Sequence, residues 1–149
     1  MLRIHRETDY AIRVILALAK YPPGEVVTSA SIRQEMLLPE SLSLQIISRL
    51  AHLSLINSFP GRNGGIQLAR LPEDITLYDV ILGLEGPMVL SDCLEEGNHC
   101  ELSSRCPVQE YWIDLQDRIT EDLKSVNFQY LSKRAEYFTD REVQLSKDI

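Results

Sequence analysis

The sequence predicts a mostly α-helical chain with a small β wing, that is, an α+β winged helix-turn-helix followed by a long C-terminal dimerisation helix. Two short helical segments, separated by the turn Leu37-Leu38-Pro39, come directly before a glycine-rich hairpin. After residue 107 apolar residues recur at intervals of three or four, as in helices that pack along another helix. The 149 residues suffice for one domain with a sizeable core.

Three helices are expected before residue 54, because apolar side chains recur there at helical spacing. Thr28 or Ser29 supplies a capping hydroxyl for the second helix. Proline and a carboxylate suit the first turn of a helix, so Pro39 or Glu40 begins the third. The expected helices cover residues 8–20, about 30–36 and 39–53.

A hairpin and one more helix complete this part of the chain. Two short apolar strands flank a glycine-rich loop, and Asn63-Gly64 at the centre of the loop is a turn signal. Thr76 and, three residues later, Asp79 resemble a capping box at the start of a helix that Gly86-Pro87 ends. The strands are expected at 56–59 and 66–69, and the helix at 77–84.

The rest of the chain is expected to form a polar loop with all three cysteines, one long helix and a loose tail. The apolar seam of that helix consists of Trp112, Leu115, Ile119, Leu123, Val126 and Tyr130. The expected parts are a winged helix-turn-helix with its linker helix (1–85), a cysteine loop (86–106), a dimerisation helix (107–133) and a tail (134–149).

Charge and hydropathy exclude several classes of protein. Residues 1–70 carry eight Lys and Arg against five Asp and Glu, so the acidic surplus lies in the remainder and only one end suits a polyanion. No apolar stretch is long enough to span a membrane, and the charged first residues lack the apolar core of a signal peptide. We therefore expect a cytoplasmic protein with no membrane partner. No nucleophile–base pairing or phosphate loop indicates an enzyme.

The helix-turn-helix and the hairpin together predict a surface for double-stranded DNA. A helix fits the major groove, which is about 12 Å wide. Gln reads adenine, Ser contacts phosphate or base edges, and Arg or Asn at a hairpin tip reaches the backbone or the minor groove. A solvated polar face or a protein-interaction module is the alternative. The expected DNA-binding residues are Arg3, Arg6, Glu40, Ser41, Ser43, Gln45, Arg62 and Asn63.

Cys93, Cys100 and Cys106 lie within 14 residues of a polar loop. An odd number leaves one thiol over in any disulfide pairing. Reduced thiolates suit an iron–sulfur cluster, zinc or Cu(I), and three of them fit a two-iron or four-iron cluster with an unusual fourth ligand. A zinc site that adds His99, a thiol sensor and the absence of any shared role are the alternatives.

Taken together, these features resemble the Rrf-two family of bacterial regulators, from residue 6 to about 131. Residues 8–13 look like the family's first helix, 61–70 like its wing and returning strand, and 75–81 with 84–87 like its linker helix. The three cysteines match the cluster loop of its iron–sulfur members, the IscR and NsrR types. The resemblance implies a homodimer joined by the long C-terminal helix and a palindromic operator.

The fourth ligand departs from one version of the family pattern. IscR-type members have a histidine three residues after the last cysteine, where this chain has Gln109. NsrR-type members use an aspartate near the start of the partner subunit's first helix, and Asp9 matches that position. The resemblance thus implies Asp9 as a ligand, with His99, His5, Glu7 or solvent as alternatives.

We therefore expect a DNA-binding transcriptional repressor controlled by an iron–sulfur cluster that senses nitric oxide, redox state or cluster supply. One rival is the same regulator sensing through thiols or zinc without a cluster. Another is an iron–sulfur carrier or redox protein that uses the winged domain for protein contact. The operator sequence does not transfer from IscR-like members, because Leu44 replaces a glutamate of their recognition helix and Pro60 an arginine before the wing.

Overall fold

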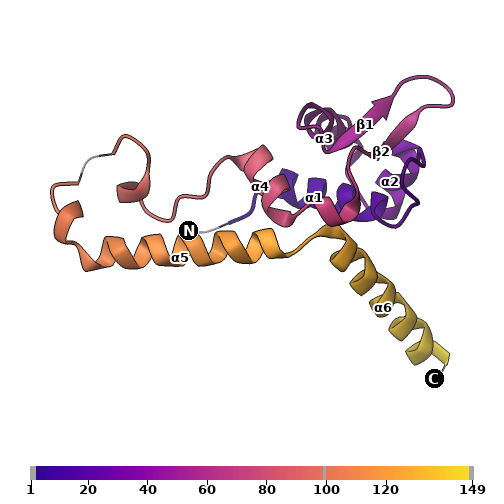
Figure 1. Cartoon of the computed structure of the whole chain (residues 1–149). Helices are drawn as coiled ribbons and strands as arrows, with labels where there is room; N and C mark the ends of the chain where they lie inside the picture. Colours follow the sequence, from indigo (N-terminus) through magenta and orange to yellow (C-terminus); the bar gives the residue numbers. More distant parts are fainter. Residues whose placement is uncertain (1–2, 99, 148–149) are drawn as a thin grey trace.

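The computed structural model describes residues 3–98 and 100–147, with side chains described as far as residue 138. It has the α+β winged-helix architecture that the sequence predicts. Figure 1 shows α5 extending away from the winged-helix domain, with the cysteine loop (86–106) leading from the end of α4 to the far end of α5. The elements are α1 (Arg6–Leu18), α2 (Ser29–Glu35), α3 (Glu40–His52), β1 (Ile56–Phe59), β2 (Gly65–Leu68), α4 (Leu77–Glu85), α5 (Pro107–Ser125) and α6 (Phe128–Lys147).

The core of the winged-helix domain lies between α1, α3 and the hairpin. On α1, Ala11, Val14, Ile15 and Leu18 recur at helical spacing and are buried, and Leu50 of α3 belongs to the same core. Burying a Val, Leu or Ile side chain stabilises the fold by about 1.5–3 kcal/mol. None of the helices in the described ranges is long and apolar enough to cross a membrane.

The wing is the antiparallel pair of β1 and β2, with Phe59 opposite Gly65. Its turn differs from the prediction, because the N–H of Gly64 donates to the carbonyl of Gly61 at 3.0 Å. Arg62 and Asn63 are therefore the central residues of the turn, and Gly61 takes the positive φ of 101°. Gly65 is required for space, because a Cβ there would lie 2.3 Å from the carbonyl oxygen of Val27.

The capping box of α4 is confirmed. The hydroxyl of Thr76 accepts a hydrogen bond from the N–H of Asp79 at 3.2 Å, and the Asp79 carboxylate accepts from the N–H of Thr76 at 2.8 Å. Gly86, with a φ of 84°, ends the helix as expected. The cysteine loop therefore begins immediately after the last residue of α4.

The prediction of one helix over 107–133 with a loose tail is wrong. The chain breaks at Val126 and Asn127 into α5 and α6, and α6 continues to residue 147. The break forms because the 126–128 segment pairs with the start of α4: the carbonyl of Val126 accepts from the N–H of Leu77, and the N–H of Phe128 donates to the carbonyl of Ile75, each at 3.0 Å. The Asn127 side chain then accepts from the N–H of Tyr130 at 2.9 Å.

The turn between α2 and α3 carries backbone strain at an exposed leucine. Thr28 caps α2, as predicted, by accepting a hydrogen bond from the N–H of Ser31. At the other end of α2, Leu37 has a φ of 52°, and the following N–H, that of Leu38, donates to the carbonyl of Arg33 at 2.9 Å. Leu37 is 82% exposed, so its side chain gains little packing in return for the left-handed backbone.

We expect the substitution Leu37→Gly to raise the free energy of unfolding by about 0.5–1 kcal/mol, because glycine adopts the left-handed region without a Cβ clash. Urea denaturation at one protein concentration measures the change. Leu37→Ala is the control, since alanine keeps the Cβ and should bring no gain. Equal stability of the glycine and alanine variants would show that the positive φ costs nothing.

Candidate DNA-binding surface and cysteine loop

The first half of α3 presents a mixed polar and apolar face beside the wing. Ser41, Gln45 and Leu44 are exposed, and Leu44 is 74% exposed. A groove of about 370 Å³ lies between α2, α3 and the wing, and its lining includes both Leu44 and Arg62. Asn63 is exposed next to Arg62 in the turn of the wing. The fold thus brings residues from two separate predicted DNA-binding segments to one groove.

The prediction that α3 exposes Ser43 is wrong. Ser43 is 6% exposed, and its hydroxyl donates to the carbonyl of Glu40 at 3.0 Å. The reason is helical spacing, because Ser43 lies on the same face as Ile46, Ile47 and Leu50, which are buried in the core. Leu44 takes its place as the exposed residue.

Leu44 is a candidate that the sequence interpretation did not include among the DNA-binding residues. The sequence could have indicated this, because the helical spacing puts Leu44 outside the face of α3 that is buried in the core, so its side chain faces solvent. Its neighbour Glu40 carries a carboxylate that lies 2.9 Å from Nη1 of Arg33, an ion pair between α2 and α3. That ion pair offsets the negative charge of Glu40 at the start of the helix.

The two N-terminal arginines lie apart from the groove. Nε of Arg6 donates to the hydroxyl of Tyr10 at 3.0 Å, so its side chain lies along α1. Arg3 lines a pocket together with Glu85 and Pro87, beside the start of the cysteine loop. Their predicted contacts with DNA phosphate stay predictions.

The three cysteines are free and partly buried, at separate places along the loop. Cys93 lies in a short 3-10 turn, and the hydroxyl oxygen of Ser91 is 3.4 Å from its sulfur. Cys106 is the N-cap of α5. Gln109 Nε2 donates to the carbonyl of Cys93 at 3.0 Å, which ties the loop to the first turns of α5.

Three thiols are the kind of ligand that a soft metal binds, but the described part of the structure does not place them around one point. Among residues 3–98 and 100–147, no three Cys, His, Asp or Glu side chains are close enough together to hold a metal ion. His99, the histidine of the alternative zinc site, lies outside the described residues. Three sulfur donors on one loop fit an iron–sulfur cluster or zinc in chemistry.

Asp9 lies in the first turns of α1, where its carboxylate is accessible. Its Oδ2 is 2.6 Å from Nη2 of Arg13, one helical turn later, and half of the Asp9 side chain is exposed. Figure 1 shows α1 near one end of α5, while the cysteine loop starts at the end of α4 beside α1 and reaches the other end of α5. An ideal helix of the length of α5 spans about 28 Å. Cys106 caps that other end of α5, so α1 and Cys106 of the same chain lie roughly the length of this helix apart.

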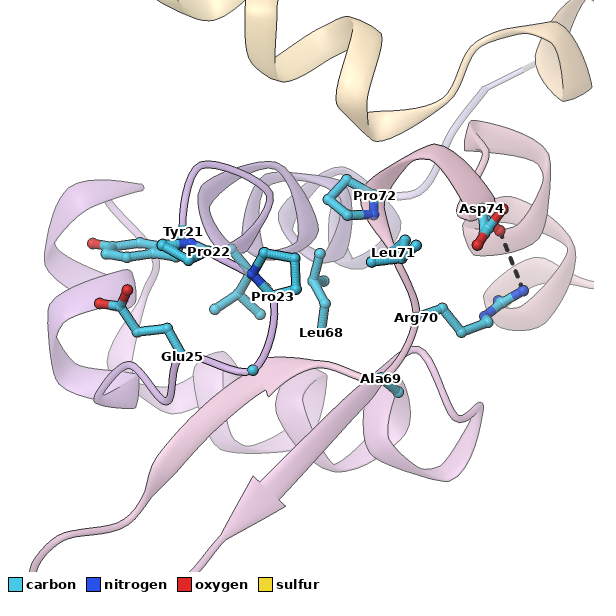
Figure 2. Close-up of a pocket in the computed structure, with 12 residues that line it drawn as sticks. Tyr21, Pro22, Pro23, Glu25, Leu68, Ala69, Arg70, Leu71, Pro72 and Asp74 are labelled. Carbon is cyan, nitrogen blue, oxygen red and sulfur yellow. Dashed lines mark hydrogen bonds between the residues drawn. The ribbon is translucent and has the colours of Figure 1, made fainter.

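Figure 2 shows another pocket, which is separate from the α3 groove and from the cysteine loop. Its volume is about 410 Å³. It lies between the loop after α1 and the segment that follows β2. Tyr21 and Pro22 line one part of it, and Nη1 of Arg70 donates to the carbonyl of Asp74 at 3.4 Å in another. Its described lining contains no cysteine and no residue of α3, so the pocket is not part of the candidate site.

Comparison with known proteins identifies the family. The model of Rrf2, described as an iron-dependent transcriptional regulator, matches residues 4–134. The chain belongs to the Rrf2 family, the Rrf-two family of the sequence resemblance. The HTH-type transcriptional regulator NsrR of Bacillus licheniformis is 30% identical to this Rrf2 protein over 127 residues, which covers 80% of this chain and 89% of the relative.

Solved structures of the Rrf2 family have the same fold. CymR, described as the global cysteine regulator of B. subtilis, matches with a TM-score of 0.74 at 31% identity, covering 90% of this chain and 98% of that one. IscR of T. potens matches with a TM-score of 0.70 at 26% identity, covering 90% and 88%. This Rrf2 protein is therefore a transcriptional regulator and not an enzyme.

Glu85, the last residue of α4, lies next to the cysteine loop, and its surroundings change the pKa of its carboxyl group. Burial raises the pKa of Glu85, but hydrogen bonds from the Thr8 side chain and from the backbone and side chain of His5 outweigh that effect, so its pKa lies below the ordinary value. The His5 N–H is 2.9 Å from Oε1, and only 17% of the Glu85 side chain is exposed.

We expect Glu85→Gln to lower the free energy of unfolding by about 1–2 kcal/mol at pH 7, because hydrogen bonds to a charged group are lost. A lowered pKa means that the carboxylate stabilises the fold above its ordinary pKa of 4.5 and that this contribution is lost as pH falls through the lowered value. The difference between wild type and variant, measured by urea denaturation, should therefore shrink below about pH 4. Glu40→Gln, at an 85% exposed side chain, is the control and should show little difference at either pH.

Proposed function

We propose that this Rrf2 regulator is a cytoplasmic homodimer that represses transcription at a palindromic DNA operator, and that the state of its cysteine loop controls operator binding. One observation carries the proposal. The chain combines an exposed polar face of α3 beside the wing with three free thiols on a loop at the far end of α5. One feature suits reading of DNA and the other suits sensing.

The groove between α3 and the wing supports the DNA-binding part of the proposal. Gln45 is exposed where a recognition helix reads bases, and Gln pairs with adenine through two hydrogen bonds. Leu44 adds an apolar surface that suits the methyl group of thymine. Ser41, Arg62 and Asn63 flank this pair and suit phosphate or minor-groove contacts. We propose these five residues as the core of the DNA-binding surface.

The surface of α5 supports a homodimer. Every residue of this 19-residue helix is at least partly exposed, although it carries a seam of apolar side chains. Val108 and Tyr111 are each 55% exposed. Apolar side chains along a helix gain most when a second helix covers them. A second copy of the chain, packed along α5, is the partner we propose, and two DNA-binding heads then match a palindrome.

An iron–sulfur cluster is the cofactor we propose for the loop. Cys93, Cys100 and Cys106 would hold it through sulfur, and Asp9 of the partner subunit would supply oxygen, because α1 of the same chain lies near the end of α5 that is opposite to Cys106. When bound, the cluster supplies a centre that reacts with nitric oxide or oxidants. Gln109 has a supporting role, since its hydrogen bond to the Cys93 carbonyl holds the segment around Cys93 on α5.

Thiol sensing without a cluster is the second candidate. The observation that favours it is that the three thiols are free, partly exposed and not gathered around one point within the described residues. Exposed thiols are open to oxidation, which changes the loop without any metal. DNA binding by α3 and the wing is common to both candidates.

The deciding experiment is anaerobic purification, followed by an absorption spectrum and by iron and sulfide analysis. We expect a brown protein with iron and sulfide in fixed ratio to the chain, and a colourless protein when all three cysteines are replaced by serine. The wild type is then used to select duplexes from a random DNA library, and we expect a palindromic consensus. A colourless wild type after reconstitution with iron and sulfide contradicts the cluster, and the absence of any enriched duplex contradicts the regulator's DNA surface.

A further inference from the structure

Three helices of the winged-helix domain meet where the cysteine loop begins. The start of α1, the second half of α3 and the end of α4 contribute polar groups that bind one another. We name this contact the polar junction. It consists of His5, Glu7, Thr8, Arg49, Leu84 and Glu85.

Arg49 connects α3 to both other helices of the polar junction. Its Nη1 lies 2.9 Å from Oε1 of Glu7 in α1, and its Nη2 donates to the carbonyl of Leu84 in α4 at 2.8 Å. A guanidinium presents several N–H groups in a fixed planar fork, so one side chain fixes two directions at once. One side chain therefore links α3 to both α1 and α4.

The end of α4 is also tied to the residue before α1. The N–H of His5 donates to Oε1 of Glu85 at 2.9 Å, and His5 Nδ1 lies 3.0 Å from Oε2. Glu85 is the last residue of α4, and Gly86, with its positive φ of 84°, is the first residue of the cysteine loop. Any displacement of the loop stem therefore acts directly on α1 through Glu85 and on α3 through the carbonyl of Leu84.

The DNA-facing part of α3 lies one helical turn from Arg49. Gln45 precedes Arg49 by four residues and is exposed, so a small rotation of α3 about the junction changes where the Gln45 side chain points. The ion pair of Arg49 is itself partly exposed, with 41% of the Arg49 side chain accessible. Only 27% of the Glu7 side chain is exposed and its Oε1 is buried, so the contact is shielded from water on the α1 side.

We propose that Arg49 is a positioning residue that transmits the state of the cysteine loop to the recognition helix. This inference rests on the proposed function, because it requires that the loop controls operator binding. An Arg49 that only contacts DNA phosphate would instead change the affinity of both loop states equally. The ratio of the two affinities therefore separates transmission from simple contact.

The test uses the full chain with a duplex selected by the wild type. Affinity is measured for protein reconstituted anaerobically with iron and sulfide and for metal-free, reduced protein. We expect the two wild-type affinities to differ by about 5–150-fold, the usual range of allosteric coupling. Arg49→Met should bring their ratio to within about twofold of one, and Arg49→Lys should restore part of it. Lys20→Met removes an ion pair of 2.8 Å to Glu35 far from the loop stem and should leave the wild-type ratio.

Hydrogen exchange of the α3 amides in the two states gives a second readout that needs no DNA. In the wild type we expect a change in protection between the states, and in Arg49→Met no change. If Arg49→Met is too unstable to purify, Glu7→Gln takes its place, because it removes the charge paired with Arg49 and keeps the bond to Leu84. If these variants keep the wild-type ratio of the two DNA affinities, the role of Arg49 is overturned, but the proposed control by the loop is not. A wild type whose two states bind DNA equally overturns the proposed control by the loop and, with it, the inference.

Discussion

Replacing Phe128 with alanine is expected to lower the free energy of unfolding by about 3–5 kcal/mol. Phe128 is the first residue of α6 and is fully buried in the core of the winged-helix domain. Removing its ring leaves a cavity that the surrounding helices fill only in part, so the loss includes a cavity contribution as well as lost hydrophobic burial. Urea denaturation at a fixed protein concentration measures the change, since a dimer's stability depends on concentration.

Phe59 supplies the matched control, because it is the same residue type at a 43% exposed position on β1. We expect Phe59→Ala to cost about 1 kcal/mol or less, since much of its ring already faces solvent. A loss for Phe128→Ala as small as that for Phe59→Ala would contradict the anchoring of α6 in the domain. A large loss would show that the start of α6 is anchored in the core of the winged-helix domain.

The break itself shows where sequence periodicity stops being informative. Apolar residues keep intervals of three and four from Trp112 to Tyr130, straight through Val126 and Asn127. The break depends on hydrogen bonds to Ile75 and Leu77, which are some 50 residues earlier, and no local pattern records such a pairing. Asn127 was the available signal, because Asn favours the N-cap and its side chain accepts a hydrogen bond from the N–H of Tyr130.

Several elements whose geometry is local were predicted correctly, although the centre of the wing turn was not. The capping box of Thr76 and Asp79 depends on residues three apart, and the structure contains both of its hydrogen bonds. The hydroxyl cap of Thr28 is likewise a contact within one turn. Helical burial of α1 follows from the spacing of its own side chains. In each case the residues that determine the structure lie within one or two turns of one another.

The candidate site was predictable in its residues more than in its geometry. Three cysteines in a polar loop indicate sulfur chemistry by type alone, but the tie between Gln109 and the Cys93 carbonyl depends on how the loop folds back on α5. The junction of Arg49 with Glu7 and Leu84 joins three helices, so no spacing in the sequence records it. Contacts of this kind require the tertiary structure, whereas the burial of Ser43 follows from its spacing to Ile46, Ile47 and Leu50 on α3.

Replacing Asp9 with asparagine is expected to reduce the retention of iron and sulfide by at least about tenfold, if retention is measured as the rate of loss to a chelator under anaerobic conditions. Asparagine keeps the shape of the side chain but removes its charge, which makes it a weak iron ligand. Cys106→Ser, which removes a proposed sulfur ligand, is the positive control and should retain no cluster. The prediction depends on a second copy of the chain, because α1 lies near the end of α5 that is opposite to Cys106.

Arg13→Met separates ligation from helix structure. Asp9 and Arg13 form an ion pair on α1, with 2.6 Å between Oδ2 and Nη2, and either substitution breaks it. Such an i,i+4 pair contributes only about 0.3–0.5 kcal/mol to a helix, so neither variant should unfold. If Asp9 is a ligand, Asp9→Asn loses iron and sulfide quickly and Arg13→Met keeps them. Equal loss in both variants would assign the effect to the ion pair, and retention in both would leave Asp9 with no part in the centre and return the fourth position to His5, Glu7, His99 or solvent.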